Sequence, residues 1–90
     1  MPTVSIPSYL QSKLENKKEI SFKEGYIYEI LENLIEMNIE LREILLDNDN
    51  KLRRYIKIFI NGKDIRFLDD EKSFVKINDQ VTILTAVAGG

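Results

Sequence analysis

Hydrophobic and polar residues alternate near the start of the chain, which is the pattern of a β-strand with one buried face. Val4 and Ile6 are separated by a serine and flanked by two prolines, so a short strand is predicted there. Residues 18–22 alternate in the same way, and the more polar residues 9–18 predict a turn or loop. The two strands predict an opening hairpin. Because no glycine for a tight turn lies between them, we expect a longer connection.

The apolar period changes to that of a helix after residue 25. Apolar residues fall at helical spacing while polar residues occupy the other faces: Ile27, Ile30, Leu31, Leu34 and Ile35. Glu24 and Gly25 precede this segment, which places a negative charge near the positive end of the helix dipole, and Asn38 is the predicted stop. Residues 41–46 predict one more short helix before the polar loop 47–50.

The strand pattern returns in residues 55–60, which form the clearest strand of the sequence. Its faces alternate, with Ile56, Ile58 and Ile60 on one and Tyr55, Lys57 and Phe59 on the other. Asn61-Gly62 is a strong signal for a two-residue hairpin turn and predicts a further strand at residues 63–67. A second polar turn then leads into the last strand, which is predicted for residues 80–86.

The order of the elements, a hairpin, a helix and then the remaining strands, constrains the architecture. Such a chain buries most apolar surface if the helix lies across one face of a mixed sheet. This predicts an α+β fold of the β-grasp (ubiquitin-like) type, with a generic α+β arrangement as the alternative. No internal repeat or linker divides the 90 residues, so residues 1–90 are predicted to form a single domain.

The composition excludes several classes of function. With 13 basic and 15 acidic residues the net charge is −2, so nothing attracts the chain generally to nucleic acid or to an anionic membrane. Cysteine and histidine are both absent, which removes disulfides, thiolate nucleophiles, imidazole bases and the usual zinc ligands. We expect no metal site. The uncharged C-terminal run is too short to span a membrane, and the amino terminus lacks the basic-then-apolar pattern of a signal peptide. These two observations predict a cytoplasmic protein.

The end of the chain is the feature that most indicates chemistry. Asp79 is the last charged side chain, and the sequence closes on small residues and two glycines. Glycines make a slender segment that fits a narrow groove and leaves the terminal carboxylate without a steric shield. Two terminal glycines alone are equally typical of a frayed end. Directly after the last strand of a β-grasp fold, they favour a functional and flexible tail at residues 86–90.

Two aromatic residues, Tyr55 and Phe59, share the strand face opposite the isoleucines. The outer face of a sheet that is covered on one side is expected to be polar. The two aromatics are therefore a candidate partner-binding patch beside the final strand. The alternative is that Tyr9 or the segment 41–46 covers them.

Charged residues gather at the start of the strand 55–60 and in the loops. The basic cluster consists of Lys51, Arg53, Arg54 and Lys57. We interpret this cluster as charged residues that are exposed to solvent at the start of the strand. The alternative is that it attracts an acidic surface of a partner protein. The acidic pairs at positions 47 and 49 and at 69 and 70 lack metal-binding spacing and are interpreted as loop residues.

Four segments of the chain carry a family resemblance: residues 3–7, 52–61, 64–67 and 81–90. On these segments the sequence resembles the MoaD/ThiS family of ubiquitin-like sulfur carriers, and more closely its cysteine-biosynthesis and molybdopterin-synthase small-subunit-like members. The last segment is the specific one, because an ending in Ala-Val-Ala-Gly-Gly is characteristic of these carriers. Thr85 stands where the family often has proline, a departure that leaves the terminal glycines intact.

The resemblance implies that the reactive group is the carboxylate of Gly90. An adenylating enzyme would activate it with ATP, it would become a thiocarboxylate, and a sulfur-accepting synthase would receive the sulfur in a pathway of the cysteine or molybdopterin type. The tail that enters the partner's active site would be formed by Ala86, Val87, Ala88 and Gly89. The chain would then be a carrier without a cofactor of its own rather than an enzyme, and a variant of this role is that of the small subunit of a synthase, whose tail inserts into the active site of its partner.

The resemblance leaves two further points open. Some relatives are first trimmed by a metalloprotease, a step not needed here if the sequence is complete at Gly90. The alternative function is that of a ubiquitin-like protein modifier, in which the same activated carboxylate of Gly90 is joined to lysines of target proteins.

Overall fold

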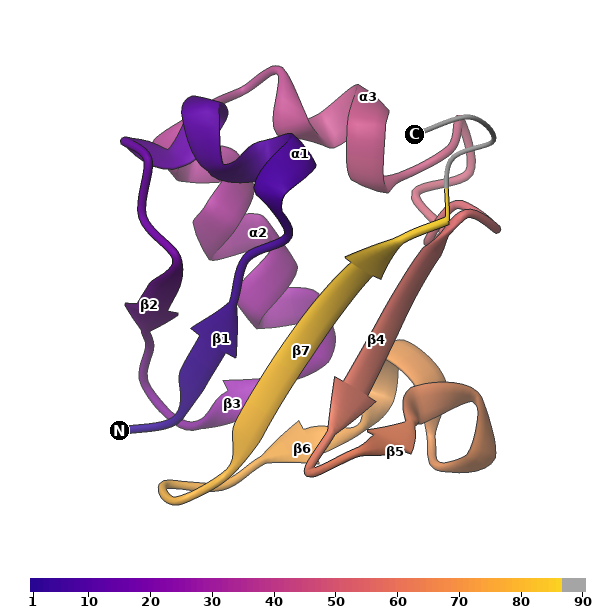
Figure 1. Ribbon diagram of the computed structural model, residues 1–90. Helices are drawn as coiled ribbons and strands as arrows, with labels where there is room; N and C mark the ends of the chain where they lie inside the picture. The colour runs from indigo at the N-terminus through magenta and orange to yellow at the C-terminus, as the bar shows by residue number, and fades with distance from the viewer. Residues whose placement is uncertain (87–90) are drawn as a thin grey trace.

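The computed structural model of the chain describes residues 1–86 and shows a sheet that carries a helix across one face (Figure 1). Within these residues the strands are β1 (Thr3–Ser5), β2 (Glu19–Ser21), β3 (Gly25–Tyr26), β4 (Ile56–Ile60), β5 (Lys63–Asp64), β6 (Phe74–Val75) and β7 (Gln80–Thr85). The helices are α1 (Ser8–Gln11), α2 (Ile27–Met37) and α3 (Leu41–Leu45), with short 3₁₀ turns η1 (Ser12–Leu14), η2 (Ile65–Phe67) and η3 (Asp70–Lys72).

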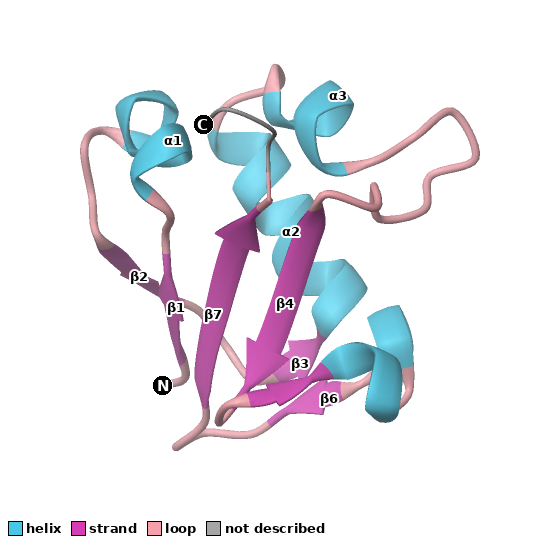
Figure 2. Cartoon of the chain, turned by 45° about the vertical axis from the view of Figure 1, so that its right-hand side comes forward, coloured by secondary structure: helices cyan, strands magenta, loops and turns pink. Residues whose placement is uncertain are grey.

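The main sheet has five strands in the order β2-β1-β7-β4-β5, which puts the last long strand of the chain in the centre. β7 runs parallel to β1 and antiparallel to β4, so the sheet is mixed. Figure 2 shows α2 lying behind β7 and β4. A second sheet of two strands pairs β3 with β6. This arrangement confirms the predicted β-grasp fold.

The helix α2 begins and ends close to the predicted positions. Its first turn is closed by Glu29, whose Oε1 accepts a hydrogen bond from the Tyr26 backbone N–H at 2.9 Å. It ends at Met37, and Asn38 takes an extended conformation that continues the chain away from the helix. The five apolar residues of its predicted face are all buried and belong to the same core as the isoleucines of β4. The core therefore lies between α2 and the sheet.

The opening connection is longer than a tight turn, as expected, but it is helical rather than a loop. Leu10 and Leu14 lie four residues apart in α1 and η1, and both are 1% exposed. The spacing turns both leucines toward the core, which favours a helical turn over an irregular loop. The prediction of a turn or loop at residues 9–18 was therefore wrong for this part of the segment.

The predicted strand at residues 63–67 was also wrong beyond its second residue. Only Lys63 and Asp64 pair with β4, and the chain then turns into η2. Asp64 causes the turn, because its Oδ1 accepts the backbone N–H of Arg66 at 2.9 Å and caps the 3₁₀ helix. Ile65 is thereby directed into the core, where it is 1% exposed. The hairpin turn itself is confirmed, with positive φ at both Asn61 and Gly62.

Candidate functional site

The chain leaves the sheet at the end of its central strand. Thr85 pairs with Ile56 of β4, and one residue later the N–H of Ala86 donates to the carbonyl of Tyr55 at 2.7 Å. Ala86 is exposed. Of the predicted tail residues, Val87, Ala88, Gly89 and Gly90 lie outside the described residues. The described part of the site is therefore the strand that holds and directs this tail.

The position of β7 fixes the point at which the chain leaves the sheet. Its first three residues pair with β1 on one side, and residues 81–85 pair with β4 on the other, so the strand cannot tilt without breaking hydrogen bonds. Four residues beyond Ala86 span at most about 14 Å when fully extended.

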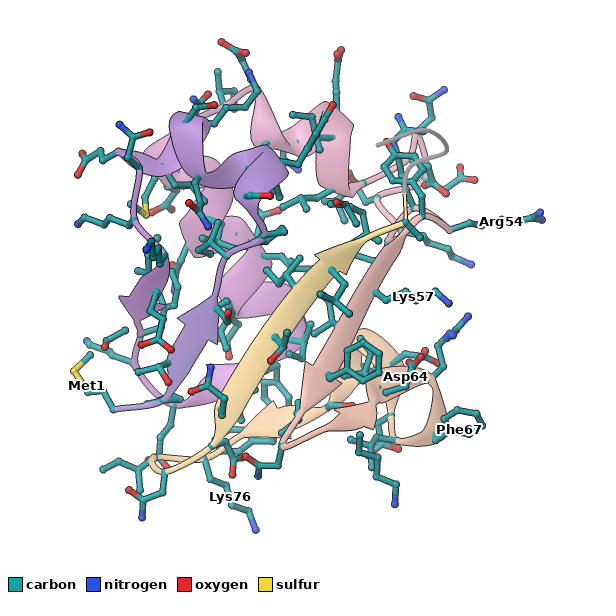
Figure 3. The ribbon with its side chains drawn as sticks, viewed as in Figure 1. Met1, Arg54, Lys57, Asp64, Phe67 and Lys76 are labelled. Atoms are coloured by element: carbon teal, nitrogen blue, oxygen red, sulfur yellow. The ribbon has the colours of Figure 1, made fainter. Side chains whose placement is uncertain are left out.

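The open face of the sheet beside this exit carries an apolar pair. Leu84 lies opposite Lys57, and Phe59 lies opposite Thr82, on the face turned away from α2. Leu84 is 47% exposed, whereas Phe59 and Lys57 are half-buried. Figure 3 shows Lys57 extending outward from β4. Leu84 lies two residues before Ala86, and Phe59 lies on the same face, diagonally across the two strands from it. We call these two apolar residues the open-face pair.

Tyr55 does not belong to this surface in the way that the sequence suggests. It precedes β4, its hydroxyl donates to the carbonyl of Ile44 at 3.1 Å, and its ring packs against the core. The segment that follows α2 therefore covers Tyr55, which is the alternative left open by the sequence. Leu84 was missed, although the signal was present. The alternation that buries Val81 and Ile83 puts Leu84 on the open face.

Some residues of the charged clusters make hydrogen bonds that hold the loops in place. Arg53 Nε donates to the carbonyl of Glu43 at 2.6 Å, so it ties the segment before β4 to α3. Asp47 Oδ1 accepts the N–H groups of Lys51 and Asp49, and these hydrogen bonds hold the pKa of the Asp47 carboxyl below its usual range. Residues 1–86 hold no group of three or more acidic side chains placed to bind a metal ion.

None of the helices formed by residues 1–86 has the length and apolar character needed to cross a membrane.

Comparisons with known proteins agree with the fold and identify the family. The profile of the ThiS family matches residues 4–90. The sulfur carrier protein CysO of Mycobacterium tuberculosis is 33% identical over 90 residues, which are 98% of this chain and 97% of that protein. The crystal structure of that CysO superposes with a TM-score of 0.85 at 30% identity and covers 97% of this chain and 100% of its own.

Two further solved structures are similar over nearly their whole length. A chain in the crystal structure of the Amycolatopsis orientalis BexX/CysO complex has a TM-score of 0.84 at 35% identity and covers 100% of both chains. The small archaeal modifier protein 1 from Methanosarcina acetivorans has a TM-score of 0.84 at 23% identity, covering 99% of this chain and 95% of its own. The last similarity shows a shared fold alone.

Proposed function

Because the chain belongs to the ThiS family, we propose that it is a sulfur carrier whose reactive group is the carboxylate of Gly90. The observation that carries the proposal is the position of β7, the central strand of the sheet, which ends at Thr85 and leads into the uncharged tail. A rigid strand followed by a short sequence that closes on two glycines could present a carboxylate to a partner without a catalytic side chain.

The proposed chemistry takes place on the main chain. An oxygen of the Gly90 carboxylate attacks the α-phosphorus of ATP, which is bound to an adenylating enzyme, and pyrophosphate leaves. Sulfide then attacks the acyl carbon, AMP leaves, and the product is a thiocarboxylate. Adenylation is needed because a free carboxylate is a poor electrophile, and the thiocarboxylate is an ionised sulfur nucleophile at neutral pH. ATP is thus a substrate of the partner and not a cofactor of this chain.

The residues of this chain contribute position and recognition. Pairing with β4 and the hydrogen bond from Ala86 to Tyr55 hold the end of β7 from which the tail begins, and Leu84 of the open-face pair lies in this part of the strand. We expect Phe59 and Leu84 to contact the adenylating enzyme, because an apolar surface next to the tail is buried when the partner closes over it. The full-length similarity to CysO proteins supports this carrier role. For the receiving synthase we propose a pathway of the cysteine or molybdopterin type.

A mass measurement tests the proposal. The chain is incubated with the adenylating enzyme of the same organism, ATP and sulfide, and its intact mass is compared with that of a variant lacking Gly89 and Gly90. The full chain should gain the mass difference between sulfur and oxygen, and the shortened variant should gain nothing while its spectrum remains that of a folded protein. Sulfur uptake by the shortened variant would overturn the proposal.

A second experiment, in a cell extract, separates the carrier from the protein modifier. A modifier would be joined through Gly90 to lysines of other proteins and would appear in a cell extract as larger covalent species. The carrier is expected to appear only as the unmodified chain and its thiocarboxylate. Lysine-linked species that depend on the two terminal glycines would favour the modifier.

A further inference from the structure

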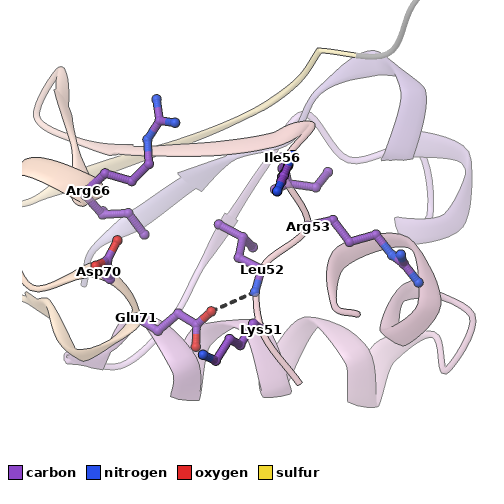
Figure 4. Close-up of a pocket in the computed structure, with 9 residues that line it drawn as sticks. Lys51, Leu52, Arg53, Ile56, Arg66, Asp70 and Glu71 are labelled. Atoms are coloured by element: carbon purple, nitrogen blue, oxygen red, sulfur yellow. Dashed lines mark hydrogen bonds between the residues drawn. The ribbon is translucent and has the colours of Figure 1, made fainter. Parts of the chain in front are cut away.

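A depression of about 580 Å³ opens on the molecule beside the start of β4 (Figure 4). Two segments that are far apart in the sequence form it, residues 51–56 on one side and residues 65–71 on the other. The backbone N–H of Leu52 donates to Glu71 Oε1 at 2.7 Å and so links the two sides. This hydrogen bond gives the depression, which we call the β4 pocket, a defined shape.

The floor of the β4 pocket is apolar. Ile56 and Ile65 are 3% and 1% exposed and reach the pocket from the core, and Leu52 is half-buried beside them. An aliphatic side chain of a ligand could therefore bury its surface against these three residues. A floor of this kind favours a ligand with an apolar group over a purely ionic one.

The rim of the β4 pocket is positively charged, although the chain as a whole is acidic. Its basic residues are Lys51, Arg53, Arg54 and Arg66, and its acidic residues are Asp70 and Glu71. The excess of basic over acidic residues on the rim contrasts with the net charge of −2 for the whole chain. The local excess of positive charge favours the binding of an anionic group at the pocket.

The rim charges differ in whether they are already paired. Arg66 Nη2 lies 2.8 Å from Asp64 Oδ2, and this guanidinium holds the pKa of the Asp64 carboxyl below its usual range. Glu71 already accepts a hydrogen bond from the backbone N–H of Leu52. Lys51 and Arg54 are exposed, and no ion pair involves either of them within the described part of the chain. These two residues are the available cations of the rim.

The β4 pocket lies next to the point where the tail leaves the sheet. Ile56 of its floor pairs with Thr85, and Tyr55, which follows Arg54, accepts the hydrogen bond of Ala86. Figure 3 shows the side chain of Arg54 extending outward from the molecule near the start of β4. A partner segment seated in the pocket would therefore be held close to the base of the tail.

We propose that the β4 pocket binds an acidic peptide segment with one aliphatic side chain, supplied by the protein that acts on Gly90. This inference rests on the proposed function for the identity of the partner, but not for the chemistry of binding. Carboxylates of the segment would pair with Lys51 and Arg54, and its aliphatic side chain would cover Ile56 and Ile65. A nucleic acid would lack stacking partners, since the lining holds no aromatic residue.

The chemistry of binding is tested without any partner protein. The ¹⁵N-labelled full chain is titrated with a short capped peptide of aspartate and leucine, and in parallel with a peptide in which lysine replaces aspartate. We expect saturable shifts of the amides of Leu52, Ile56 and Ile65 with the acidic peptide only. Shifts that do not saturate, that lie elsewhere, or that the lysine peptide or inorganic phosphate reproduces equally would overturn the proposal.

A pair of charge-reversal variants tests the available cations. Lys51→Glu with Arg54→Glu is compared with Lys18→Glu and Lys23→Glu, two exposed lysines around the edge strand β2, so that both double variants have the same net charge. The first pair should weaken peptide binding at least about tenfold, and the second should bind like the parent chain. Equal weakening in both pairs would show a general charge effect and overturn the proposal.

The same variants, assayed with the adenylating enzyme, test the role of the pocket in the proposed function. Reversal of Lys51 and Arg54 should raise the KM for the carrier about tenfold and leave kcat unchanged, because the pocket touches no reacting atom. An unchanged KM would overturn this role of the pocket while the carrier function stands. If the parent chain were not adenylated at all, the proposed function would fail, and the peptide titration would still decide what the pocket binds.

Discussion

The two faces of β4 and β7 are made by alternate residues of the same strands and meet opposite environments. On the face toward α2, Ile58 pairs with Ile83, and these side chains are 1% and 2% exposed. On the open face the neighbouring residues Lys57 and Leu84 form a pair, and Leu84 is 47% exposed. The inner face fixes the shape of the molecule, and the outer face is left available for recognition.

This division has a consequence for the tail. Because side chains alternate along a strand, a register shift of one residue between β7 and β4 would exchange the two faces. The buried isoleucines oppose such a shift, and in doing so they also fix where Ala86 leaves the sheet. We therefore expect inner-face substitutions to affect folding, and open-face substitutions to affect partner binding at constant stability.

The largest effect is expected for Ile58→Ala. The substitution leaves a cavity between the sheet and α2, and the free energy of unfolding should fall by about 2–5 kcal/mol. Urea unfolding followed by circular dichroism measures the change. Lys57→Ala, one residue earlier and on the other face, should change it by no more than about 0.5 kcal/mol. Similar losses in the two variants would contradict the division between the faces.

The second prediction concerns the open face. Leu84→Thr keeps a residue that favours strands but removes apolar surface beside the tail. We expect the KM for the carrier with the adenylating enzyme to rise about fivefold to tenfold, which corresponds to roughly 1 kcal/mol, while stability stays unchanged. Ser21→Thr on the exposed edge strand β2 is the matched control. An unchanged KM for Leu84→Thr would remove the open-face pair from the docking surface.

Much of this comparison could be predicted from the sequence, because it follows from local periodicity. The alternation around Ile58 and the helical spacing from Ile27 predicted the isoleucine face of β4 and α2 correctly, whereas Tyr55 was placed on the open face and is covered. The terminal glycines indicated where the proposed chemistry takes place. Phe59 was placed on the open face by the same reasoning, and Leu84 could have been placed there too.

The rest depended on contacts between distant segments or on competing local hydrogen bonds. β3 and β6 contain two residues each, too few to show a period, and Gly25 pairs with Val75 across the chain. The side chain of Asp64 ended the predicted strand by capping η2. The β4 pocket needs Arg66 and Glu71 beside the basic cluster, and only the tertiary fold brings these segments together.

The third prediction tests to which face Tyr55 belongs. Tyr55→Phe keeps the ring but removes the hydroxyl that donates to the carbonyl of Ile44. The free energy of unfolding should fall by about 1 kcal/mol, and the KM for the carrier should stay unchanged. Tyr9→Phe is the matched control, since Tyr9 is 56% exposed and should tolerate the change. A raised KM at constant stability would instead make Tyr55 part of the docking surface.

The smallest effect is expected at Asp79, at the end of the sheet opposite the tail. Its carboxylate accepts the N–H of Lys76 at 2.8 Å and the side-chain amide of Asn61 at 2.9 Å, and these hydrogen bonds hold the pKa of Asp79 below its usual range. A carboxyl whose pKa is lowered by folding stabilises the protein above its unfolded pKa of about 3.9, and this contribution is lost as the pH falls through the folded pKa.

Asp79→Asn should therefore lower the melting temperature at pH 7 by only a few degrees, on the order of 3 °C. The difference in melting temperature between variant and parent should narrow as the pH falls from about 4 through the lower folded pKa of Asp79, because Asp79 of the parent chain then loses its charge. Melting curves of both proteins across this pH range measure this difference. The other acidic groups are the same in the two proteins, so they affect both melting temperatures equally. A gap that stays constant down to the lowest pH would show that the charge of Asp79 does not stabilise this end of the sheet.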